Sequence, residues 1–261
     1  MKYFFFFLFF TPILTAQVLN VDRITQTDSI NNKWVGFTDV SFSSDKLKNN
    51  VLDGSTKFEL NYFFENNYFI VGALSNDLTL NGNEVIQNEG FIQIRYRDMD
   101  TREWSTETFV QYQWNGALGM EYREVLGSNI RKRFFEKKKV DLYAGLGVFY
   151  ELEQWNWSGV DGSQSLISNP TPNRQLLRLN NYWKAAYKIN ENMDISAITY
   201  FQFPMNNDFL NPRWFIDINT YIKMTKNLSF IIHYDHTIDH YRLVPVSNYY
   251  YSFNFGIQLK W

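Results

Sequence analysis

The segment 249–261 alternates between two kinds of side chain with a period of two. Its odd-numbered positions, from Tyr249 to Trp261, are all aromatic or aliphatic, and most of the even-numbered positions are polar or glycine. Such alternation places successive side chains on opposite faces of a β-strand. The apolar face is longer than most soluble strands need and approaches the ~9–11 residues with which a tilted strand crosses a bilayer. The segment is therefore predicted to be a transmembrane strand, and the alternative is a buried strand of a soluble sandwich.

The N-terminus predicts export. Lys2 precedes an apolar run over residues 3–10, and the small residue Ala16 follows. This is the pattern of a secretory signal peptide, and the run is far shorter than the ~20 apolar residues of a spanning helix. We expect cleavage after Ala16, and Gln17 in place of cysteine excludes a lipoprotein anchor. The predicted organisation is a signal peptide over 1–16, a short periplasmic segment over 17–32 and one barrel domain over 33–261.

Composition narrows the class of protein further. The chain has no cysteine, so neither disulfides nor thiolate-based catalytic or metal sites are available. Its formal charge of −2 indicates no nucleic-acid partner. Aromatic residues make up 19% of the chain, as expected where Trp and Tyr form girdles at both interfaces of a membrane barrel.

Period-two alternation recurs along most of the chain. In the segment 104–114, for example, Trp104 and Trp114 stand at the two ends of one face, whereas Glu107, Gln111 and Gln113 occupy the other. An even number of such strands is typical of a bacterial barrel. We predict an all-β, antiparallel up-and-down transmembrane β-barrel of about 12 strands, over 33–43, 55–64, 68–80, 90–98, 104–114, 122–135, 140–153, 176–189, 193–203, 213–224, 228–239 and 249–261.

The lengths of the connections predict the orientation. Bacterial barrels have short periplasmic turns and longer extracellular loops. Short and long links alternate here, which places both termini in the periplasm. The predicted short turns are 65–67, 98–103, 136–139, 190–192 and 225–227, and the predicted long loops are 45–54, 81–89, 115–121, 154–175, 204–212 and 240–248.

Charged residues of both signs fall on the predicted interior face. Burying a charge costs several kcal/mol unless it is paired. These side chains therefore either form ion pairs that plug the barrel or line a water-filled pore, and the sequence leaves both open. The predicted lumen charge network consists of Lys57, Glu59, Arg95, Arg97, Glu107, Arg131, Arg133, Asp141, Glu151, Glu153, Arg178 and Lys184.

No catalytic, cofactor-binding or metal-binding residue is assigned. The candidates for catalysis are His233, His236 and His240, but strand periodicity puts the first two on opposite faces. The glycines Gly145 and Gly147 lie inside a predicted strand, where a phosphate-binding loop has no place and glycine more often relieves crowding. We expect no cofactor.

Several segments carry a family resemblance. They are the Trp34-Val35-Gly36 opening, the 109–113 strand, the 123–133 strand and the 142–151 run Leu-Tyr-Ala-Gly-Leu-Gly-Val-Phe-Tyr-Glu. Together they resemble an uncharacterised family of salt-induced outer-membrane proteins, in the version found in Bacteroidota-type bacteria. The resemblance covers nearly the whole mature chain and implies a membrane barrel without an established activity or active site.

These observations predict a non-enzymatic protein of the bacterial outer membrane, either a narrow channel or a structural, stress-related barrel of unknown substrate. Its expected partners are outer-membrane lipids and the barrel-assembly machinery, which recognises a C-terminal strand ending in an aromatic residue; the oligomeric state is open. One alternative is a membrane-embedded lipid-modifying enzyme of the phospholipase or acyltransferase type. Another is a periplasmic lipid-binding barrel, whose apolar faces would point inward.

Overall fold

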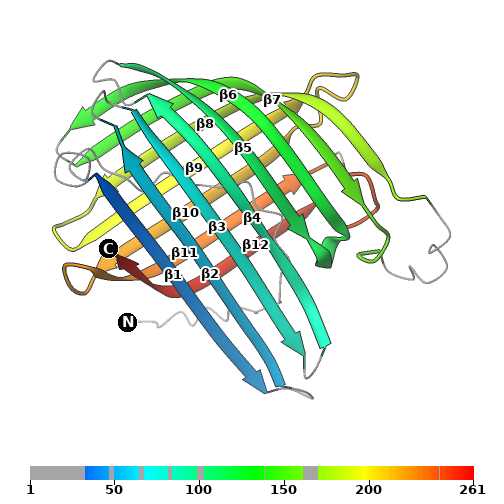
Figure 1. Cartoon of the computed structure of the whole chain (residues 1–261), viewed down its shortest axis with the longest axis horizontal. Coiled ribbons are helices and arrows are strands. Elements are labelled where there is room, and N and C mark those ends of the chain that lie inside the picture. The colour runs from blue at the N-terminus through cyan, green and yellow to red at the C-terminus, as the bar shows by residue number, and fades with distance from the viewer. Residues whose placement is uncertain are drawn as a thin grey trace, which may run out of the picture.

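The computed structural model describes residues 33–46, 50–64, 68–81, 84–98, 103–137, 139–160, 170–240 and 242–261. Within these ranges, twelve antiparallel strands form one closed barrel, in which β1 pairs with β12 (Figure 1). The predicted fold class is confirmed; the predicted signal peptide (1–16) and periplasmic segment (17–32) lie outside the described residues. The strands are β1 (Trp34–Lys46), β2 (Asn50–Phe63), β3 (Tyr68–Asn81), β4 (Glu84–Asp98), β5 (Trp104–Asn115), β6 (Met120–Lys137), β7 (Val140–Trp155), β8 (Asn173–Lys188), β9 (Met193–Pro204), β10 (Arg213–Lys223), β11 (Leu228–Asp239) and β12 (Tyr249–Lys260), with one 3-10 helix, η1 (Gly116–Leu118).

The predicted alternation decides which side chains leave the barrel. In β12, Phe253, Phe255 and Ile257 are exposed on the outside, whereas Gln258 is buried. Exposure of a continuous apolar surface of this kind to water is unfavourable, whereas contact with the hydrocarbon of a bilayer is favourable. No helix in the described ranges is long and apolar enough to cross a membrane. The exposed apolar belt includes Ile92, Ile94, Val110, Leu126, Ile130, Leu146, Val148, Phe253, Phe255, Ile257 and Leu259.

Aromatic rings gather at the ends of this belt. At the end where β1 begins and β12 finishes, Trp34 packs on Tyr62 with ring centroids 4.4 Å apart, and Phe134 stacks on Trp183 at 5.8 Å. At the other end, Tyr112 stacks on Tyr122 at 6.4 Å. Amphipathic rings favour the interface between lipid headgroups and hydrocarbon, so the two groups of rings match the girdles of a membrane barrel.

Two of the predicted long loops are wrong. The segments 45–54 and 81–89 belong largely to strands, and the links between β1 and β2 and between β3 and β4 comprise only residues 47–49 and 82–83. Strand pairing uses backbone hydrogen bonds, so polar residues with turn propensity still pair when a partner strand lies alongside. The longer links that remain, 116–119, 156–172, 205–212 and 240–248, all lie at the same end of the barrel.

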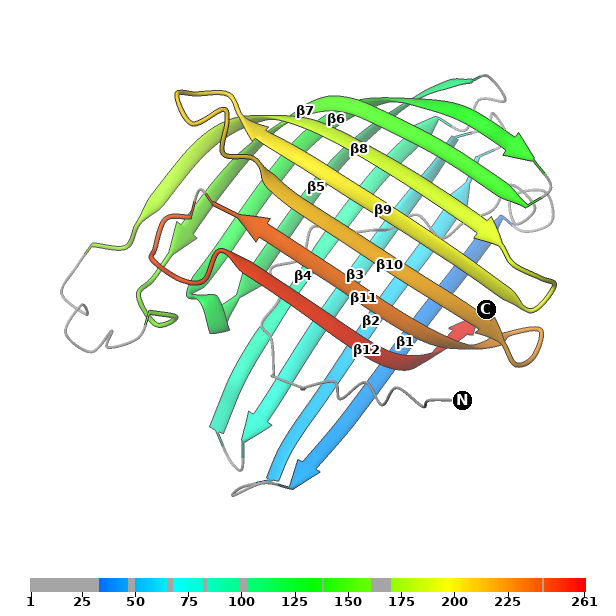
Figure 2. The same cartoon turned by 180° about the vertical axis from the view of Figure 1, so that it is seen from behind.

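The barrel closes through a short seam between β1 and β12. Their paired residues run only from Phe37↔Lys260 to Val40↔Ile257, and Gly36 and Trp261 exchange backbone hydrogen bonds of 2.9 and 3.0 Å. The indole of Trp261 covers Gly36, where a Cβ atom would lie 2.4 Å from the ring. Beyond this seam the two strands diverge (Figure 2). Glycine at position 36 therefore contributes to closure, because the absence of a side chain allows Trp261 to pack against β1.

The orientation of β12 predicts two different costs for the same substitution. Arginine at Phe255, on the outer face, should destabilise the barrel by ~2–4 kcal/mol, as lipid-facing arginine does near the bilayer midplane. Arginine at the neighbouring Asn254 should cost much less, because Asn254 faces the interior and donates to Ser252 Oγ at 3.2 Å. Denaturant titration of both variants refolded in lipid vesicles measures the difference. Equal costs, or the reverse order, would contradict the orientation of this strand.

Candidate functional site

The interior of the barrel holds all twelve residues of the predicted charge network. Lys57, Arg133 and Asp141 are half-buried, and the other nine are buried. Alternation along each strand accounts for this placement, since the apolar neighbours of these residues face outward. The structure does not bring the twelve into one group: two clusters of ion pairs involve members of the network, one around Glu107 and one around Glu151 and Glu153.

Glu107 of β5 is the centre of the first cluster. Arg97 donates to its Oε2 from Nε at 3.1 Å and from Nη2 at 2.8 Å, and Arg95 Nη1 lies 3.4 Å away. Asn129 Nδ2 and the hydroxyl of Tyr182 donate to Oε1 at 3.0 and 2.7 Å. Since Tyr182 is on β8, this last bond crosses the lumen to β5, past two intervening strands.

A glycine makes the crossing by Tyr182 possible. The tyrosine ring lies against Gly145 of β7, where a Cβ atom would be 2.0 Å from the ring. Any larger residue at position 145 would displace the ring and the bond to Glu107. The glycine therefore relieves crowding inside the barrel at the point where an interior side chain must lie flat on the wall.

Glu151 and Glu153 of β7 hold the second cluster. Glu151 accepts from Arg178 and lies 2.9 Å from Arg123 Nη2, and Glu153 lies 2.6 Å from Arg174 Nη2. These carboxylates are fully enclosed, which requires that each be neutralised and hydrogen-bonded.

Arg213 connects this second cluster across the barrel. It is on β10, and its Nη1 and Nη2 atoms lie 3.2 Å from Glu151 Oε2 and 3.0 Å from Glu153 Oε1 of β7. Its Nε donates to Asp239 Oδ2 of β11 at 2.8 Å. One guanidinium thus ties three strands together through three carboxylates, which fills the lumen between β7 and β10.

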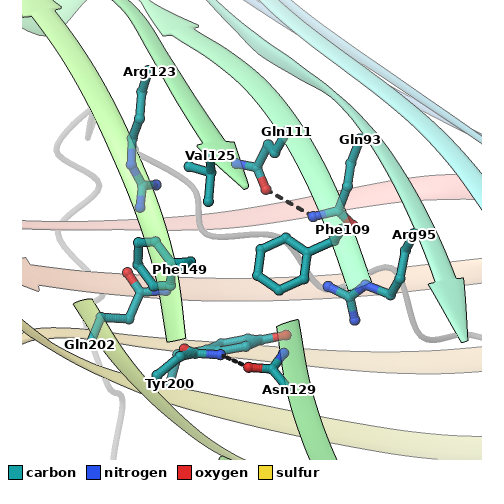
Figure 3. Close-up of a pocket in the computed structure, with 11 residues that line it drawn as sticks. Gln93, Arg95, Phe109, Gln111, Arg123, Val125, Asn129, Phe149, Tyr200 and Gln202 are labelled. Atoms are coloured by element: carbon teal, nitrogen blue, oxygen red, sulfur yellow. Dashed lines mark hydrogen bonds between the residues drawn. The ribbon is translucent and has the colours of Figure 1, made fainter. Parts of the chain in front are cut away.

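A small cavity lies in the interior and is lined by Arg95 of the first cluster and Arg123 of the second (Figure 3). It has about 20 Å³ of room for the centres of water molecules, enough for one or two of them. Gln93 Nε2 donates to Gln111 Oε1 at 2.9 Å on its wall, and aromatic rings close its sides. The lining residues are Gln93, Arg95, Phe109, Gln111, Arg123, Val125, Asn129, Phe149, Asn180, Tyr200 and Gln202.

The three histidines do not converge on one site. His233 faces the interior, with Nε2 at 3.0 Å from Asp217 Oδ2 and 3.8 Å from Asp235 Oδ1. His236 is on the opposite face and packs against the rings of Trp214 and Tyr251, with centroids 5.6 and 6.4 Å away. His240 is exposed. In the described part of the chain, no group of three or more His, Asp or Glu side chains is arranged to hold a metal ion.

One mouth of the barrel is covered by three links. Val244 of the β11–β12 link is buried against Leu118, Met120, Trp155 and Tyr250, with further residues of the β7–β8 link around them. Beneath this cover, the guanidinium of Arg242 stacks over the ring of Tyr250, with the Cζ atom 4.3 Å from the ring centroid. Burial lowers the pKa of Arg242.

The lumen network predicted from sequence did not include four members of the second cluster, and it did not include the neighbouring Arg242. Arg123 and Arg174 stand at or near strand ends, Arg213 begins a strand, and Asp239 ends one. The alternation along β10 could have identified Arg213 as an interior residue, because Arg213 lies on the same face of the strand as the buried Phe215 and Asp217. Arg242 lies outside the strands, where period-two alternation carries no information.

The chain belongs to a family of unknown function. Residues 46–258 match the family model described as "Protein of unknown function, DUF481". No curated protein matches the chain.

Solved structures with a similar fold are outer-membrane barrels. A NanC porin is 12% identical with a TM-score of 0.49, and the match covers 86% of this chain and 98% of the porin chain. The translocator domain of the autotransporter NalP from Neisseria meningitidis is 9% identical with a TM-score of 0.43, covering 89% and 91%. A KdgM porin in complex with disordered oligogalacturonate is 9% identical with a TM-score of 0.42, covering 87% and 98%.

The first cluster predicts a large cost for removing one charge. Glu107→Gln keeps the shape of the side chain but leaves Arg95 and Arg97 without their shared carboxylate, so the free energy of unfolding should fall by ~3–5 kcal/mol. Glu191→Gln, in an exposed turn, is the matched control and should change it by less than about 0.5 kcal/mol. Denaturant unfolding of both variants in the same micelles provides the comparison. Similar stabilities would show that Glu107 does not hold the cluster together.

Proposed function

We propose that this protein is a non-enzymatic outer-membrane β-barrel whose lumen is closed at rest by ion pairs across its interior. The observation that carries the proposal is the bridge from Arg213 of β10 to Glu151 and Glu153 of β7. A solute or ion would have to displace these buried groups to pass. The barrel in this state therefore serves as a structural element of the envelope or as a channel that must first be opened.

The membrane location is supported by the outer surface. An exposed apolar belt is bounded by aromatic rings at both ends, as in barrels that sit in lipid. The proposal includes a signal peptide over residues 1–16, outer-membrane lipids as the surroundings, and recognition of β12 by the barrel-assembly machinery. The resemblance to salt-induced outer-membrane proteins of Bacteroidota-type bacteria adds a stress-related envelope role.

The energetics of the interior favour closure over a wide aqueous pore. Glu107, Glu151 and Arg178 are almost completely shielded from solvent, so water does not screen them. Each is instead held by a direct charge-assisted hydrogen bond, which is the stronger arrangement in a medium of low dielectric constant. The cavity beside the clusters has about 20 Å³ of room for the centres of water molecules, which is far less than an aqueous pore needs.

The histidine arrangement supports a non-enzymatic role. A hydrolase of the serine–histidine type needs its histidine to accept the proton of the serine hydroxyl. Here Ser252 Oγ donates to Asp235 Oδ1, and His233 contacts Asp217 and Asp235. The lipid-modifying alternative therefore lacks a serine–histidine pair at His233.

Conductance measurements test the closed state. The refolded protein in planar bilayers should show no discrete ion steps. The double variant Glu151→Gln, Glu153→Gln strands Arg123, Arg178 and Arg213 in a poorly solvated interior and should lose several kcal/mol of stability.

An exterior pair provides the control for this double variant. Glu103 and Glu191 are exposed, and Glu103→Gln, Glu191→Gln should leave stability nearly unchanged. Steady conductance of the wild type, together with a double variant that shifts selectivity toward anions at unchanged stability, would reject the closed lumen in favour of a water-filled pore.

Protease access tests the proposed orientation. The β7–β8 link, residues 156–172, is the longest connection between strands and should be extracellular, with both termini in the periplasm. A protease site inserted into this link should be cut on intact cells. A site inserted into the 224–227 link should be cut only after the outer membrane is opened. The opposite pattern would invert the topology.

A further inference from the structure

The links that cover the mouth approach each other closely at two glycines. Gly119 has a left-handed backbone with φ 80°, and a Cβ atom there would lie 2.6 Å from the carbonyl oxygen of Asn156. A Cβ atom at Gly159 would lie 2.4 Å from the backbone of Leu118. Both glycines thus let η1 and the β7–β8 link approach closely. Val244 completes the cover from the third link.

Donor groups gather beneath the cover without acceptors. The Nη1 and Nη2 atoms of Arg242 are buried and have no hydrogen-bond partner, and its Nε donates to the backbone oxygen of Asp239 at 3.3 Å. Trp155 Nε1 is also buried and unpartnered, and the buried hydroxyl of Tyr250 has only the side chains of Arg242 and Ser247 beside it. Trp155 and Tyr250 belong to the same apolar cluster, and Tyr250 stacks on Arg242. Burying such groups without acceptors costs free energy for each group.

Guanidinium groups outnumber carboxylates in the second cluster and around Arg242. Five guanidinium groups and three carboxylates interact there, and Glu89, whose carboxylate accepts from Asn115 beside Leu118, adds a fourth carboxylate at the same end of the lumen. The interacting groups are Arg123, Arg174, Arg178, Arg213 and Arg242 with Glu151, Glu153 and Asp239.

We propose that Arg242, Trp155 and Tyr250 form a binding site for an oxyanion, the carboxylate or phosphate group of a small solute, beneath the cover of the mouth. The two Nη atoms of a guanidinium match two oxygens of such a group, and the indole N–H and phenol O–H supply further donors. Stacking on Tyr250 fixes the plane of the guanidinium and leaves its edge for the ligand. A cation would find no acceptor among the unpartnered groups of Arg242 and Trp155.

Entry to the site requires movement of the cover, because the donor atoms are buried. The β11–β12 link carries both Arg242 and the buried Val244, so the residue that binds the anion and the residue that seals the mouth move together. Binding is independent of whether the lumen conducts ions. The binding site and the closed lumen proposed above are therefore tested by separate experiments.

Anion titration of the full refolded protein tests the site. In maltoside micelles, which carry no phosphate or carboxylate, inorganic phosphate and acetate are titrated by calorimetry at constant ionic strength against chloride. Wild type should bind both oxyanions in preference to chloride. Arg242→Gln should weaken binding by about tenfold or more, and Arg242→Lys, which keeps the charge but loses the two-pronged geometry, should weaken it less. Tyr250→Phe removes only the hydroxyl and should have the smallest effect.

Lys226→Gln is the matched control, since Lys226 is an exposed cation in a turn at the other end of the barrel. It should bind oxyanions as the wild type does. Titration with dodecyl phosphate separates a lipid headgroup from a free solute as the source, since a headgroup site binds it more tightly than inorganic phosphate. Equal oxyanion binding by Arg242→Gln and the wild type, or no preference for oxyanions over chloride, would overturn the proposal. If Arg242→Gln does not refold, Arg242→Lys and Tyr250→Phe decide the outcome by the same criteria.

Discussion

Closure of the sheet is the constraint on which the rest of the structure depends. A strand edge cannot stay unpaired in hydrocarbon, so the chain returns to β1 through β12 and the barrel closes. Closure then divides every strand into an outer and an inner face. Apolar side chains take most of the lipid side, and most of the charged side chains in the strands lie in the interior. The ion-pair network is therefore the counterpart of the apolar belt, produced by the same alternation.

Arginine side chains neutralise the buried carboxylates of the interior. Glu107, Glu151 and Glu153 each contact more than one guanidinium, and Glu151 alone contacts Arg123, Arg178 and Arg213. The forked guanidinium can reach two carboxylates at once, as Arg213 does, which lysine could not do with the same geometry. This sharing lets few carboxylates hold many cations, and it links strands that are not neighbours in the sheet. The network stiffens the barrel across its diameter as well as around its wall.

The sequence predicted the strand number, and in the described residues it placed buried charges such as Glu59, Arg95 and Glu151 on the inner face, because period-two alternation is a local property that each strand carries by itself. It failed at 45–54 and 81–89, where Asn, Asp and Gly indicate turns but the adjacent strand supplies a partner for pairing. Contacts between distant strands were also beyond it. The bond from Tyr182 to Glu107 and the bridge from Arg213 to Glu151 depend on strand tilt and register, which no single strand specifies. Arg242 lies in a link, where facing cannot be read from alternation.

Asp239 joins the covered mouth to the interior network. It is the last residue of β11; its carboxylate accepts from Arg213, and its backbone oxygen accepts from Arg242 Nε. Its backbone N–H donates to Asn248 at 2.7 Å, which fixes the base of the β11–β12 link. Lifting this link would disturb the residue that anchors Arg213, and Arg213 in turn holds Glu151 and Glu153. Asp239 thus belongs both to the base of the β11–β12 link and to the set of ion pairs that includes Arg213, Glu151 and Glu153.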